Sequence, residues 1–107
     1  MNTVILTARD PLRAGDGPHA GRAARDLAVE GHEVVLVLLE DAVVLARAGH
    51  RDAVVLEEAL HAGVQVLAEE DALERRAVPR VGEGVKTTGM SEVVDLLFGW
   101  SARQAWL

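Results

Sequence analysis

The chain has 107 residues, of which half are apolar and only three are aromatic, and its formal net charge is −6. This length fits one domain, 1–107, and the apolar half is enough for one aliphatic core. The absence of cysteine excludes thiolate chemistry and cysteine-ligated metals, and the acidic balance argues against nucleic-acid and membrane-surface partners.

The first part of the chain predicts a strand–helix–strand unit. The apolar run at 3–8 predicts a strand buried on both faces, and residues 9–18, rich in Gly, Pro and Asp, predict a loop. Residues 19–30 carry apolar side chains at spacings of three and four, which predicts a helix that ends at Gly31. A second buried strand is expected at 33–39, so the unit should be parallel and right-handed.

The rest of the chain continues the alternation of strands and helices. Asp41 is expected to cap a short helix, and Ser91 a later one whose apolar face consists of Val93, Val94, Leu97 and Phe98. A parallel sheet with helices on both faces follows from this alternation. The expected elements are helices at 40–48, 52–61, 69–76 and 91–98, and strands at 64–68, 85–88 and 103–107.

The carboxyl ends of the predicted strands define a candidate ligand site. In an open parallel sheet, ligands bind in a crevice beyond these ends, and a small molecule or a nucleotide is the class of ligand that such a crevice holds. The candidate crevice residues are Asp10, His19, Glu40, Asp41, Ala68, Glu69, Thr88 and Met90.

Acidic side chains and histidines leave several readings of this site open. Glu69, Glu70 and Asp71 could bind a divalent cation or act as general acid and base. The favoured interpretation is stabilisation of a helix N-terminus, worth roughly 0.3–1 kcal/mol per charge. The four histidines show no i, i+4 pair on one predicted helix, so no metal site is predicted. An enzyme that uses His19 or these acids is a less favoured possibility.

Three stretches cover nearly the whole chain: GRAARDLAVEGHEVVLVLLEDAVVLA (21–46), GVQVLAEEDALERRAV (63–78) and GVKTTGMSEVVDLLFGWSARQAWL (84–107). In these stretches and in its order of elements, the chain resembles the small DsrE/DsrF-like sulfur-relay proteins. The resemblance implies a flavodoxin-like, three-layer α/β/α fold with a mainly parallel five-stranded sheet. It also implies assembly as a dimer, trimer or hexamer and a persulfide-carrying cysteine just after the third strand.

At the position of that cysteine this chain has Ala68. A methyl group cannot carry sulfur, and the acids that follow Ala68 would repel an anionic persulfide. We therefore expect a non-catalytic DsrE-like subunit, without cofactor, that pairs with itself or with a cysteine-bearing DsrE-like partner. Trp100 and Trp106 fill the edge of the core or anchor a subunit interface. With no signal-peptide pattern and no apolar run near the roughly 20 residues that span a bilayer, a cytoplasmic location is expected.

Overall fold

The computed structural model describes residues 1–11 and 19–107, so most of the loop expected at 9–18 lies outside the described residues. Within the described part, none of the helices is long and apolar enough to cross a membrane. The strands are β1 (Asn2–Thr7), β2 (Glu33–Leu38), β3 (Gln65–Glu69), β4 (Lys86–Thr88) and β5 (Arg103–Trp106). The helical segments are α1 (His19–Val29), the 3₁₀ helix η1 (Glu40–Ala46), α2 (Ala53–His61), α3 (Glu70–Arg75), α4 (Met90–Asp95) and the π-helical turn η2 (Leu96–Trp100).

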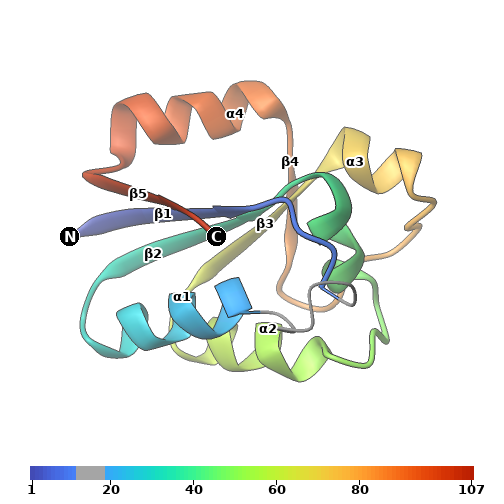
Figure 1. The fold of residues 1–107 in the computed structure, drawn as a ribbon, viewed down its shortest axis with the longest axis horizontal. Helices are drawn as coiled ribbons and strands as arrows, with labels where there is room; N and C mark the ends of the chain where they lie inside the picture. The colour runs from blue at the N-terminus through green and yellow to red at the C-terminus, as the bar shows by residue number, and fades with distance from the viewer. Residues whose placement is uncertain (12–18) are drawn as a thin grey trace.

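The strands form one sheet in the order β4-β3-β2-β1-β5. Every pairing in it is parallel, and β1 lies between β2 and β5. The chain moves outward from β1 to β4 and then returns across the sheet to β5, which places α4 and η2 on the face opposite α1 and α2 (Figure 1). The α/β fold with helices on both faces of a parallel sheet is therefore confirmed.

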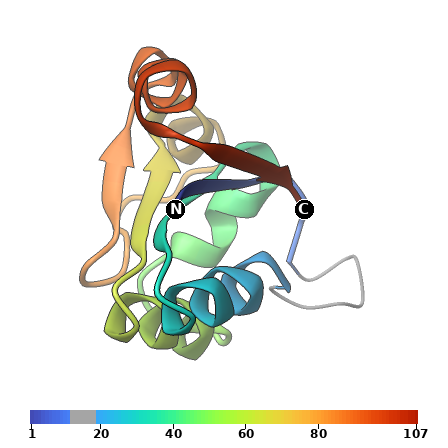
Figure 2. The same cartoon turned by 90° about the vertical axis from the view of Figure 1, so that its left-hand side faces the viewer.

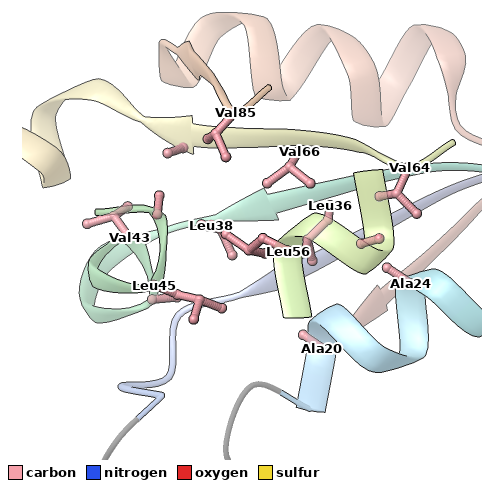
Figure 3. Packing of buried hydrophobic residues seen from close by; sticks show 14 of the residues in the cluster. Ala20, Ala24, Leu36, Leu38, Val43, Leu45, Leu56, Val64, Val66 and Val85 are labelled. Carbon is pink, nitrogen blue, oxygen red and sulfur yellow. The ribbon is translucent and has the colours of Figure 1, made fainter. Parts of the chain in front are cut away.

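Alternate side chains of each strand enter different apolar layers. Leu36 and Leu38 point toward α1 and α2, where they pack with Ala24 and Leu56 (Figure 3), and Ile5 belongs to the same cluster. On the other face, a smaller cluster forms under α4 and η2. Its buried members are Val4, Leu6, Val35, Val37, Leu39, Leu67 and Val93.

Two predicted helix caps are wrong. The N-cap of η1 is Leu39, not Asp41, because the helix begins directly at the end of β2 and leaves Asp41 inside its first turn. The N-cap of α4 is Gly89, whose carbonyl accepts from the amide of Val93 at 3.2 Å, so that Ser91 lies inside the helix.

The predicted apolar face of the last helix is only partly correct. Val93 is buried as expected, whereas Val94 and Phe98 are exposed. The helix widens into η2, where the amide of Ser101 donates to the carbonyl of Leu96 five residues earlier. The side that meets the sheet consists of Val93, Leu96, Leu97 and Trp100, which are spaced by three and four, so Val94 and Phe98 lie outside it.

Candidate functional site

The carboxyl end of β3 is occupied by the side chain of Glu69. Its carboxylate accepts hydrogen bonds from the backbone N–H of Asp71 at 2.6 Å and of Ala72 at 3.1 Å, and the residue is only 4 % exposed. Glu69 is thus the N-cap of α3. The favoured expectation, that an acid here stabilises a helix N-terminus, is met by Glu69, and two amides that could receive an external anion are already paired.

Ala68 lies inside β3, as in the strand expected at 64–68, whereas the family resemblance places its cysteine just after the third strand. It pairs with Leu38 on one side and Thr87 on the other. Its methyl group is fully buried in the layer formed with α1 and α2. The side chain of Ala68 therefore packs in the core and does not line a crevice.

At the end of β2, two carboxylates are held by arginines of the α3 segment. Nη2 of Arg76 donates to Oδ1 of Asp41 at 2.7 Å and to Oε2 of Glu40 at 3.4 Å, and Nη2 of Arg75 donates to Oε1 of Glu40 at 3.3 Å. The hydrogen bond with Asp41, followed by the charges of Asp41 and Glu40, raises the pKa of Arg76 above its ordinary value. These pairs tie η1 to α3 across the edge of the sheet.

The end of β4 adds further acids. Oγ1 of Thr88 donates to Oε2 of Glu92 at 3.3 Å. A carbon atom built at the Cβ position of Gly89 would lie 3.3 Å from Oε1 of Glu70 and 3.6 Å from Oε1 of Glu92. The strand ends β2, β3 and β4 therefore present several carboxylates, and Met90 begins α4 beside them.

Two predicted residues follow β1. Asp10 is half-buried, and His19 is exposed at the first position of α1. Residues 12–18 lie between them and are not described, so only part of the edge beyond β1 belongs to the described structure. Among the described residues, no group of three His, Cys, Asp or Glu side chains is placed to hold a metal ion.

Solved structures of other proteins resemble the fold of this chain. The ychN protein from E. coli matches with a TM-score of 0.88 and 17% identity over 100% of both chains. BT1422 from Bacteroides thetaiotaomicron has a TM-score of 0.80 and 16% identity over 99% of this chain and 94% of its own. MTH1491 from Methanobacterium thermoautotrophicum has a TM-score of 0.75 and 16% identity over 96% of both. The fold is shared. No family model matches the sequence, and no curated protein sequence matches it either.

Sequence reasoning missed the partners of the strand-end acids. Arg75 and Arg76 bind the carboxylates of Glu40 and Asp41, which lie 35 and 36 residues earlier in the chain. Local spacing carries no signal for such a contact, whereas a charge-balanced pair of segments, Glu40-Asp41 and Arg75-Arg76, could have suggested it.

A cavity of about 480 Å³ adjoins the strand ends and is lined by Glu70 and Glu74 of α3 and by Thr87 of β4. Two others have none of Glu40, Asp41 and Glu69 in their walls. One of about 430 Å³ lies between α2 and the loop at 82–85. Another, of about 480 Å³, lies beside α4 over β3 and β4. The described strand ends thus hold carboxylates with internal partners, together with a buried methyl group where the family resemblance places its nucleophile.

Proposed function

We propose that this chain is a non-catalytic DsrE-like subunit of an oligomer associated with sulfur relay, and that it does not carry persulfide itself. The proposal combines the whole-chain resemblance to DsrE/DsrF-like proteins with the surroundings of Ala68 and Glu69. Its role is to complete an assembly, either with copies of itself or with a cysteine-bearing DsrE-like partner.

The observation that carries the proposal is the occupied helix N-terminus after β3. A persulfide carrier needs a thiolate, which helix N–H groups stabilise. In this chain the carboxylate of Glu69 accepts from the N–H groups of Asp71 and Ala72, and Ala68 faces the apolar core. Both the nucleophile and the amides that would activate it are therefore taken out of sulfur chemistry.

Intact-mass measurement and sedimentation equilibrium test this function together. After incubation with a small-molecule persulfide, the purified protein should gain no sulfur, and its mass in solution should exceed that of one chain. A stable sulfur adduct on the chain, or a monomer at micromolar concentration without a co-purifying partner, would contradict the proposal.

An Ala68→Cys variant sharpens the test, because it restores the missing atom without restoring its surroundings. The new thiol would lie among aliphatic side chains, and such burial raises the pKa of a thiol and lowers its reactivity. We expect it to react with a thiol reagent far more slowly than Val54→Cys, which places a thiol on the exposed side of α2. Rapid sulfur uptake by Ala68→Cys would show that the surroundings still suit a carrier.

The alternative function, a small-ligand or nucleotide-binding domain, stays a prediction without a supporting observation. A nucleotide would bring phosphate charge to an edge that already holds Glu40, Asp41 and Glu69. Like charges at short range oppose such binding, so the described part of this edge favours the passive role.

A further inference from the structure

Large apolar side chains gather without cover on the α4 side of the molecule. In the described residues, seven such side chains are exposed, and four of them belong to the segments α4, η2 and β5. Scattered exposed apolar residues are normal, whereas a contiguous group indicates an interaction surface. The four residues are Met90, Val94, Phe98 and Trp106.

Three of these residues form a stripe along one helix flank. Met90, Val94 and Phe98 follow each other at intervals of four, which places them on the same side of α4 and η2. Phe98 is 87 % exposed and Val94 is 44 % exposed. They therefore contribute little to the core under the helix, to which Val93 belongs.

Trp106 lies on the same face of the sheet as this stripe. In the register of β1 and β5 it pairs with Leu6, a member of the layer under α4. Two residues earlier on the same face, Nε2 of Gln104 donates to the carbonyl of Leu97 at 2.9 Å. Because β5 pairs only with β1 in the described sheet, Trp106 stands at an open edge and is 65 % exposed.

The opposite flank of α4 carries the charges. Glu92 and Asp95 line the cavity that also contains Lys86, over β3 and β4. The flank toward β5 presents the apolar stripe instead. A chain with a net charge of −6 repels its own copies at most surfaces, so an uncharged flank is where two copies can approach.

This face also has less helical cover than the other. Among the described helices, α1, α2, η1 and α3 contribute to the buried cluster on one face, whereas only α4 and its continuation η2 contribute to the cluster on the other. In Figure 2, β5 runs out from beneath the end-on helix toward the C-terminus. Aromatic side chains present about 150–250 Å² each, so Phe98 and Trp106 alone expose roughly 300 Å² of the about 800 Å² that each partner contributes to a standard interface.

We infer that a second copy of this chain covers the surface formed by Met90, Val94, Phe98 and Trp106, through a two-fold contact in which the α4–η2 segments run antiparallel. A two-fold axis brings the same patch together from both copies. It sets Met90 opposite the partner's Phe98 and brings Val94 close to its own counterpart. The inference rests on the proposed function, because it names the partner and the surface of the oligomer expected there.

The absence of cysteine makes a single-cysteine experiment unambiguous. Val94→Cys should form a disulfide between copies under mild oxidation, because a residue near the axis brings its two Cα atoms within the roughly 4.4–6.8 Å that a disulfide requires. Val54→Cys is the matched control, since Val54 is also an exposed helical valine, 54 % exposed, but on α2. Groups held together have effective concentrations of about millimolar, so at roughly 10 μM protein Val94→Cys should cross-link on the order of a hundredfold faster.

Sedimentation equilibrium of cysteine-free variants distinguishes an error in the proposed surface from an error in the proposed self-assembly. Phe98→Glu should shift the protein to monomer, and Val54→Glu should leave its assembly unchanged. If the wild type assembles but Phe98→Glu also assembles and Val94→Cys cross-links no faster than Val54→Cys, this surface is wrong and the oligomeric function stands. If the wild type is a monomer at micromolar concentration, both the surface and self-assembly are overturned. Far-UV circular dichroism of each variant verifies that the exposed substitutions leave the fold intact.

Discussion

The sheet separates two layers that differ in cover and in what they leave exposed. On the side of α1, α2, η1 and α3, nineteen buried apolar residues of the described chain form one cluster. Under α4 and η2 the buried cluster has seven. The first layer is closed by the chain itself, whereas the second carries Phe98 and Trp106 on its outside. One face of the sheet thus contributes most of the buried core, whereas the other leaves apolar surface exposed, as the proposed contact between copies requires.

Truncating one leucine in each layer tests this contrast with the largest expected effect. Leu36 points into the larger cluster and Leu6 into the smaller, and both are essentially inaccessible in neighbouring central strands. Leu→Ala in a core costs about 2–5 kcal/mol, more where the surroundings cannot collapse. We expect Leu36→Ala near the upper end and Leu6→Ala about 1 kcal/mol lower, since one short helical segment can settle into the cavity.

Urea unfolding of both variants at one protein concentration measures the free energies of unfolding. An unchanged m-value is required, because only then do the two differences report stability alone. Equal losses, or a larger loss for Leu6→Ala, would mean that the α4 layer is packed as rigidly as the other.

A pair of glycines makes the same comparison with a smaller effect. A Cβ at Gly21 of α1 would lie 2.7 Å from Cγ1 of Val55, whereas nothing lies within 4 Å of a Cβ at Gly99 of η2. Overpacking costs about 1–3 kcal/mol, so Gly21→Ala should destabilise by roughly 1–2 kcal/mol after its gain in helix propensity. Gly99→Ala should stabilise by about 0.4–1 kcal/mol, because it only restricts the unfolded chain. Thermal unfolding measures the two midpoints. If both substitutions shift the midpoint in the same direction, the distinction between tight and open helix packing is wrong.

The sequence was a good guide to the strands and a poor one to the faces of the last helix. Short continuous apolar runs that are rich in β-branched residues are typical of buried strands in a parallel sheet, and the runs at 3–8 and 33–39 are close to the observed Asn2–Thr7 and Glu33–Leu38. In the stretch from Met90 to Trp100, apolar residues lie on nearly every side, and periodicity does not reveal which side meets the sheet. The η2 turn then changes the period itself.

The sequence predicts where the candidate site lies in the fold better than it predicts the contacts that its residues make. The fold rule for strand ends correctly gathers Glu40, Asp41 and Glu69 at one edge. Whether the side chain of Ala68 faces the core or the crevice depends on the register of β3, because a shift of one residue turns each side chain of a strand to the other face. The pairing of Asp41 with Arg76 joins positions 35 apart, which only the folded chain brings together.

The end of β3, where successive side chains point to different faces, gives the smallest expected effect. Ala68 enters the α1–α2 layer, while Glu69 turns its carboxylate to the N–H groups of α3. Removing a side-chain N-cap costs about 0.5–2 kcal/mol, so Glu69→Ala should lower the free energy of unfolding by about 1 kcal/mol. Glu69→Gln keeps an acceptor oxygen and should lose less. Glu74→Ala, an exposed change on the same helix, should stay within about 0.5 kcal/mol of the wild type. Urea unfolding of the three variants measures the differences. If Glu69→Ala unfolds like Glu74→Ala, the carboxylate does not hold the helix N-terminus, and the amides of Asp71 and Ala72 are open to an outside anion after all.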